Sequence, residues 1–64
     1  MRVTLKFLRG LSVDTKLMLE DVENVTSVPT LCTFLKRNEG TKKFQVQTFP
    51  LQKKVFIKVL PYGN

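Results

Sequence analysis

The chain contains no histidine and no tryptophan, and Cys32 is its only cysteine. Without histidine, Ser–His–Asp and Cys–His catalytic arrangements cannot form within one chain. A single thiolate cannot complete the four-ligand Cys/His shell of a zinc site, and it cannot form a disulfide within the chain. We therefore expect no enzymatic activity and no catalytic residue, metal or cofactor.

Glycines and acidic residues are too few for two other common ligand sites. The three glycines, at positions 10, 40 and 63, lie too far apart to form a phosphate-binding loop. The acidic segment 14–23 lacks both the Asp-x-Asp-x-Asp-Gly pattern and the loop-spaced glutamate of a calcium site. We interpret this segment as a solvated turn.

Long apolar runs are absent as well. No stretch approaches the about 20 apolar residues of a membrane helix, and residues 1–9 alternate apolar with polar side chains, unlike a signal peptide. An unpaired cysteine is typical of a reducing compartment. These features predict a cytoplasmic protein that does not associate with membranes.

The chain has 64 residues, which predicts a single small domain spanning 1–64. A core of this size rarely supplies more than about 3–5 kcal/mol unless a disulfide, a metal or a partner chain supports it. Because the first two are excluded, we expect self-association into a homo-oligomer. The alternative is a small barrel that is stable alone.

What the chain does have is positive charge, with 11 Lys and Arg against 5 Asp and Glu and a net charge of +6. Segments 1–9 and 36–58 are basic, whereas 14–23 is acidic. Such asymmetry bears on partners rather than on fold. A solvated basic surface, a nucleic-acid partner and an acidic protein partner all remain open.

Alternating or β-branched runs predict five strands. They cover residues 2–8, 15–20, 30–36, 43–49 and 53–60, with a further short extended piece at 24–28 after a turn. Pro29 would hold Val28 in an extended conformation, and Cys32 would be a small core residue. A helix near 14–24 is the alternative for the second strand.

Segments 30–36 and 43–49, joined by a polar loop with Gly40 at positive φ, predict a β-hairpin. Consecutive short strands with tight turns favour an all-β fold. We expect a small five-stranded antiparallel meander or SH3-like barrel, or alternatively four strands plus one short helix around 14–24.

The tip of this hairpin is the first candidate binding site. Its four cations could track phosphate groups, with steeply salt-dependent binding, or could simply keep an exposed loop soluble. They are Lys36, Arg37, Lys42 and Lys43.

The last strand carries the second candidate site. Its alternation directs Val55, Ile57 and Val59 into the core. The opposite face mixes two cations with apolar groups, Lys54, Phe56, Lys58 and Leu60, and Tyr62 could extend it. Three interpretations follow: Phe56 packs on a neighbouring strand, anchors a subunit interface, or stacks on a base. If the sheet is open, this strand could also pair with another chain.

Together these features predict a small non-enzymatic binding module that contacts a protein partner or a second copy of itself. In type it resembles small accessory or regulatory proteins of phages and mobile elements. The alternative is a nucleic-acid-binding protein that uses the basic hairpin and the Lys-Phe-Lys strand face.

Overall fold

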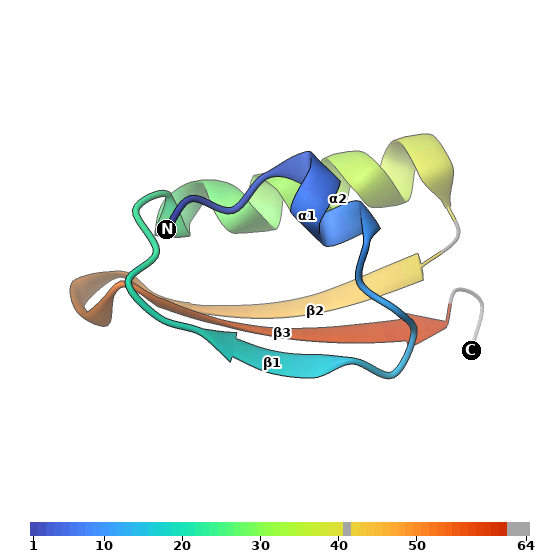
Figure 1. Cartoon of the computed structure of the whole chain (residues 1–64). Helices are drawn as coiled ribbons and strands as arrows, with labels where there is room; N and C mark the ends of the chain where they lie inside the picture. The colour runs from blue at the N-terminus through green and yellow to red at the C-terminus, as the bar shows by residue number, and fades with distance from the viewer. Residues whose placement is uncertain (41, 62–64) are drawn as a thin grey trace.

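Three strands form an open sheet, and two helices cover one of its faces (Figure 1). The computed structural model describes residues 1–40 and 42–61. Its helices and strands are α1 (Leu5–Arg9), β1 (Lys16–Leu19), α2 (Val28–Glu39), β2 (Lys42–Phe49) and β3 (Lys54–Pro61). The predicted all-β meander or barrel is therefore wrong, because the chain folds as a small α+β structure.

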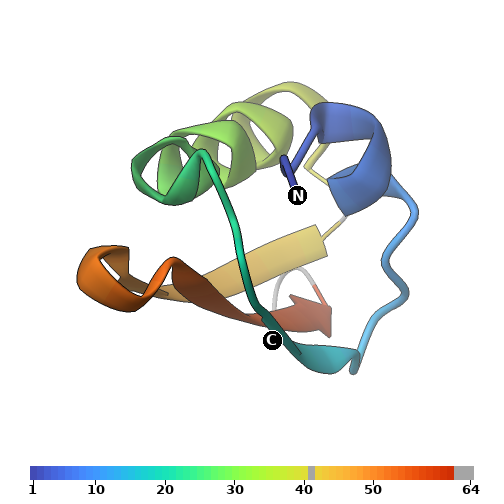
Figure 2. The same ribbon diagram turned by 60° about the vertical axis from the view of Figure 1, so that its left-hand side comes forward.

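The strand order is β1-β3-β2, with both pairings antiparallel. β2 and β3 form a hairpin through a 3₁₀ turn, Pro50–Gln52. β1 and β2 run parallel to each other on either side of β3, and α2 makes the connection between them. Figure 2 shows that both helices lie on the same side of the sheet. The last strand is thus central, and its edges are not free to pair with another chain.

Helix α2 replaces the predicted strand 30–36, so the hairpin between 30–36 and 43–49 does not exist. Val28, Cys32 and Leu35 are its buried residues, and their i, i+4, i+7 spacing is that of one helix face. Pro29 lies in the first turn, where a missing N–H breaks no helical hydrogen bond. Val28 consequently has helical rather than extended dihedrals. Gly40 has the predicted positive φ, but it ends a helix.

The predicted strand 2–8 is also wrong, because most of it forms α1. The Thr4 side chain accepts a hydrogen bond from the backbone N–H of Phe7 at 3.2 Å, as an N-cap residue does. Leu8 is fully buried on this helix. Val3 precedes the helix and is buried as well.

The predicted strand 15–20 is confirmed as β1, and the alternative helix at 14–24 is wrong. Asp14 and Asp21, just outside the strand, both have positive φ, a conformation that Asp tolerates better than most residues. The predicted extended piece at 24–28 is wrong, because Val25–Ser27 form a 3₁₀ turn that runs into α2.

The core fills the space between the helices and the inner face of the sheet. The strands predicted at 43–49 and 53–60 are confirmed as β2 and β3, and Val55, Ile57 and Val59 are fully buried, as expected. Cys32 is also in the core, as predicted. The remaining core residues are Val3, Leu8, Val22, Val25, Val28 and Leu35.

A buried amide holds the N-terminal segment against the core. The Asn24 side chain accepts a hydrogen bond from the Val3 N–H at 2.9 Å and donates one to the Val3 carbonyl at 2.8 Å. Both polar groups of Val3 are thereby satisfied by one side chain, as buried backbone groups require. This contact fixes the approach of the chain to α1.

Candidate binding face of the sheet

The sheet has one face without a helix layer, which we call the outer face. Directly opposed residues in an antiparallel sheet point to the same side, so the strand register defines its membership. In the described strands these residues are Lys16 and Met18 of β1, Lys43, Gln45, Gln47 and Phe49 of β2, and Lys54, Phe56, Lys58 and Leu60 of β3.

Phe56 lies at the centre of the outer face, between Met18 on one side and Gln47 on the other. Phe56 is half-buried by these neighbours, whereas Met18 is 49% exposed. Phe56 thus lies beside both neighbouring strands and remains partly exposed. No element among residues 1–40 and 42–61 covers this face, so the ring is available to a partner.

A second aromatic ring joins Phe56 on this face. Phe49 of β2 is opposite Lys54, so it is the diagonal neighbour of Phe56, at a typical separation of about 7–8 Å. Phe49 is 38% exposed. Phe49 was not among the residues predicted for the site, although its alternation in β2 places it with Gln45 and Gln47. Only the pairing of β2 with β3 brings the two rings together.

Four lysines surround these rings, and two of them were not expected to be neighbours. Lys16 of β1 lies directly across from Lys58 of β3, an arrangement of like charges that destabilises a sheet. Lys54 has a partial counterion in Glu20, at 3.5 Å. Lys43, at the start of β2, is exposed and lies opposite Leu60. The outer face is therefore basic around an apolar centre.

The predicted basic hairpin tip is not a single cluster. Lys36 and Arg37 are on the last turn of α2, whereas Lys43 belongs to the outer face. Lys42 has a structural role, because its ammonium group donates to the carbonyls of Arg9 at 2.8 Å and Leu11 at 2.6 Å. It thus satisfies the C-terminal end of α1, where carbonyls lack helical partners.

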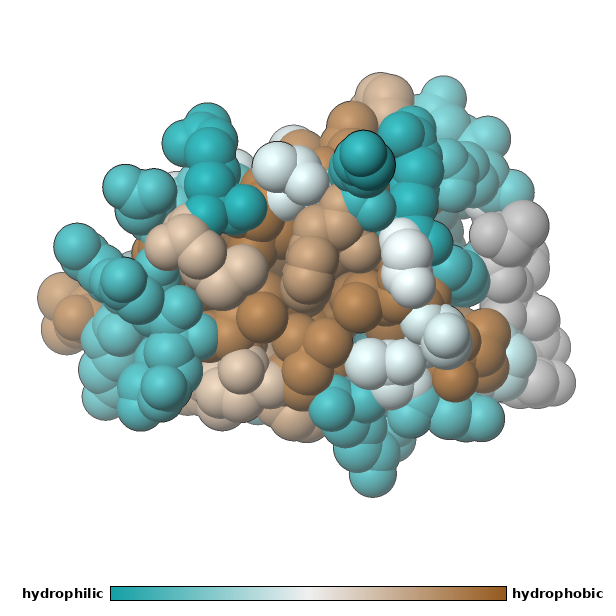
Figure 3. Space-filling model, viewed as in Figure 1, coloured by the Kyte–Doolittle hydropathy of each residue, from teal (hydrophilic) through white to brown (hydrophobic). Residues whose placement is uncertain are grey.

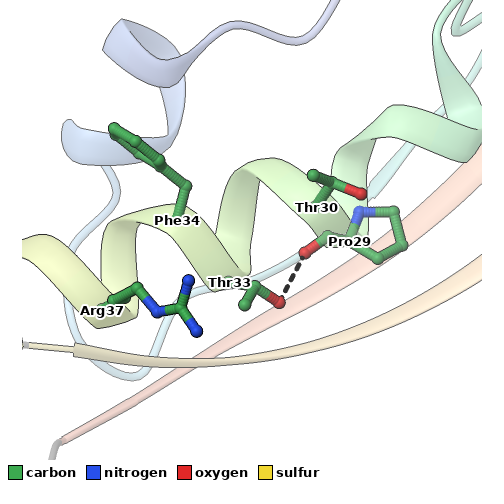
Figure 4. A pocket seen from close by; sticks show the side chains of 5 residues that line it. All are labelled: Pro29, Thr30, Thr33, Phe34 and Arg37. Carbon is green, nitrogen blue, oxygen red and sulfur yellow. Dashed lines mark hydrogen bonds between the residues drawn. The ribbon is translucent and has the colours of Figure 1, made fainter.

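The outer surface of α2 has a shallow depression, shown in Figure 4. Its five lining side chains all come from this helix: Pro29, Thr30, Thr33, Phe34 and Arg37. The Thr33 hydroxyl donates to the Pro29 carbonyl at 3.0 Å, one helical turn earlier. Phe34 is 47% exposed and stands alone as an aromatic ring in this depression. This surface has fewer converging groups than the outer face.

A third surface lies at the β1 side of the molecule. Figure 3 shows apolar surface there, between the helix layer and the sheet. Leu5, Leu11, Leu17 and Leu19 are partly buried against the core. They are continuous with the core, so we interpret this band as its incompletely covered side.

The thiol of Cys32 has no neighbouring group that would activate it. Burial raises its pKa to about 11, which keeps it in the neutral, poorly nucleophilic form. Within residues 1–40 and 42–61, no three Cys, Asp or Glu side chains gather as metal ligands do. Tyr62, the proposed extension of the last strand, lies outside the described residues.

None of the helices in the described ranges has the length and apolarity needed to cross a bilayer. The chain matches no protein-family model, and it has no match among curated proteins or solved structures. Function must therefore be inferred from the outer face itself.

Proposed function

We propose that the protein is a non-enzymatic module that binds single-stranded nucleic acid on the outer face of its sheet. The observation that carries the proposal is the diagonal pair Phe49 and Phe56, surrounded by lysines from all three strands. Single-strand binders combine exposed aromatic rings, on which bases stack, with cations that follow the phosphate backbone.

The spacing of the two rings supports this assignment. Diagonal neighbours in a sheet lie about 7–8 Å apart, which leaves room for a base on each ring when the strand is extended. Each stacked base contributes about 1–3 kcal/mol. Gln45 and Gln47, on the same strand as Phe49, supply amide donors and acceptors beside the rings.

The four lysines supply the attraction for phosphate. Lys43 lies at one end of the outer face, Lys54 lies towards the other, and Lys16 and Lys58 lie between them. The repulsion between the opposed Lys16 and Lys58 is relieved when a phosphate binds both. For single strands, log K falls against log salt with a slope of about −0.7 for each neutralised phosphate. Because Lys54 is already paired with Glu20, three to four phosphate contacts predict a slope of about −2 to −3.

A protein partner is the second candidate, and one observation favours it. Met18, directly opposite Phe56, and Phe49, its diagonal neighbour, form with it an apolar centre within a polar rim, the arrangement typical of protein interfaces. Such a partner would need acidic groups opposite the lysines. Its binding would depend less steeply on salt, because apolar burial is little affected by moderate ionic strength.

The test is fluorescence anisotropy with labelled, mixed-sequence single-stranded DNA and RNA oligonucleotides across a salt series. We expect binding at low salt that weakens steeply, with the slope given above. Lys16→Gln with Lys58→Gln should reduce the slope by about 1–2. The matched control is Lys36→Gln with Arg37→Gln, which removes the same charge from α2.

Absence of binding at low salt would contradict the proposal. Equal weakening by both double variants would show that net charge, rather than the outer face, attracts the nucleic acid. Phe56→Ala should weaken binding by about 5-fold to 100-fold, as loss of one stacked base predicts. Phe34→Ala is its matched control, because it removes an exposed ring from α2.

A further inference from the structure

The β2 edge is the longest strand edge that lacks a partner in the described structure. β2 spans eight residues and pairs with β3 alone, whereas the other edge strand, β1, spans four. Edge strands are usually protected by charges, prolines or bulges. β2 has lysines only at its first two positions, and the six residues from Phe44 to Phe49 carry neither charge nor proline.

We propose that a second copy of this chain covers this edge, forming a twofold dimer through antiparallel pairing of β2 with β2 of its partner. Antiparallel self-pairing is the isologous contact that generates a closed dimer. The pairing would join two three-stranded sheets into one sheet of six strands. This inference does not depend on nucleic-acid binding.

The charges along β2 are compatible with this orientation, because antiparallel pairing keeps the lysines of the two copies apart. Lys42 and Lys43 of one copy would lie at one end of the paired strands, and those of the second copy at the other end. The like charges are therefore separated by most of the strand length. A parallel arrangement would instead place them side by side, which is destabilising. The uncharged run Phe44–Phe49 would pair with itself.

Keeping both helix layers on one side of the sheet restricts the possible registers, and we choose the one that leaves Lys42 outside the pairing. Inner-face residues must then oppose inner-face residues, and centring the twofold axis on Val46 pairs residues 43–49 with 43–49. Gln45 would oppose the partner's Gln47. Lys43 would oppose the partner's Phe49, which allows a cation–aromatic contact. The neighbouring Lys54 is already paired with Glu20.

The side of α2 that overlooks this edge can accommodate a second copy. A groove runs between α2 and β2 and is lined by Pro29, Cys32, Thr33, Lys36, Phe44 and Val46. Phe44 and Val46 are only partly buried, although they face the core side. Because most of the α2 residues here are short, two helices could approach closely across the axis. Pairing would complete the burial of both apolar side chains.

Introducing charges at Gln45 and Gln47 tests the dimer. The mass of the protein in solution is measured by sedimentation velocity in the absence of nucleic acid. Both side chains are exposed on the outer face. Gln45→Lys with Gln47→Lys would place like charges opposite each other on both sides of the axis, and we expect monomers. Gln45→Glu with Gln47→Lys would instead place opposite charges across the interface, and we expect the dimer to be retained.

The matched control is Ser12→Lys with Val13→Lys, which adds two charges in the exposed loop before β1 and should leave the dimer intact. A monomeric unsubstituted protein at concentrations up to about 1 mM, or loss of the dimer in all three variants, would overturn the proposal. An oligomer that persists in the Lys/Lys variant would place the contact elsewhere.

A cross-linking experiment tests the register in a protein whose only thiol is introduced. In a Cys32→Ala background, Val46→Cys places a thiol on the twofold axis, facing its own counterpart, and mild oxidation should give a covalent dimer. Gln47→Cys lies opposite Gln45 of the partner and should cross-link poorly. Equal cross-linking at both positions, or at neither, would contradict the Val46-centred register.

Discussion

The two faces of β3 lie in opposite environments. On the inner face Val55, Ile57 and Val59 are fully buried. On the outer face, one residue away in each case, Phe56 and Lys58 are only half-buried and have no layer above them. The inner face stabilises the fold, whereas the outer face is free to bind a partner, so substitutions of neighbouring residues should have separable effects.

The largest expected effect is on folding, from Ile57→Ala at the centre of the inner face. Truncating a buried isoleucine costs about 2–5 kcal/mol, which approaches the whole stability expected of a domain this small. Urea denaturation followed by circular dichroism should show a protein that is largely unfolded. Phe56→Ala should remain folded with a much smaller loss. A similar loss in both variants would contradict the separation of the two faces.

The next largest effect should come from Asn24, whose side chain holds the segment before α1 against the core. Asn24→Ala removes the donor and the acceptor that satisfy Val3 and leaves two buried backbone groups without these partners. We expect a loss of about 1–3 kcal/mol in the free energy of unfolding, measured by the same denaturation. Thr26→Ala, at an exposed position of the adjacent 3₁₀ turn, is the control and should be nearly neutral.

Substitutions of two successive lysines in β2 compare the inner and outer faces in the same way. Lys42→Met removes the hydrogen bonds to the Arg9 and Leu11 carbonyls and should cost about 1–2 kcal/mol, because these bonds involve a charged donor in a partly exposed position. Lys43→Met, on the outer face, should leave stability almost unchanged and should weaken oligonucleotide binding instead. If both variants were equally stable, Lys42 would have no structural role.

Alternation was a correct guide for β2 and β3 but a wrong one for residues 2–8, which alternate as clearly and mostly form α1. It placed β2, β3 and the inner-face residues Val55, Ile57 and Val59 correctly. The helices were missed because their local signals were ambiguous. Pro29 fits a helix start as well as a strand boundary, and the β-branched and aromatic run after it has strand propensity. The helical spacing of Val28, Cys32 and Leu35 was the signal that could have identified α2.

From the sequence, the residues of the candidate site could be assigned to a face only for each strand separately. Alternation correctly separated Phe56 from the core residues of β3, and it placed Phe49 with the glutamines of β2. Bringing these two rings together requires the register of the β2–β3 hairpin, which alternation within one strand does not give. The wrongly predicted hairpin between 30–36 and 43–49 made four cations look like one cluster, whereas the fold distributes them over three environments: Lys36, Arg37, Lys42 and Lys43.

The smallest expected effect is a pH dependence of the free energy of unfolding, which arises from the buried thiol of Cys32. The pKa of the Cys32 thiol is raised by burial from 9.0 to about 11, so between these values the folded protein retains a proton that the unfolded chain has lost. Stability therefore falls as pH rises from about 9 to 11 and is unaffected by this thiol below that range. Comparing urea denaturation of the unsubstituted protein and Cys32→Ala at pH 8 and pH 10 isolates this contribution. No substitution on the outer face should alter this difference, so a Phe49→Ala protein should show it unchanged. A different value would show that the two faces are coupled through β2.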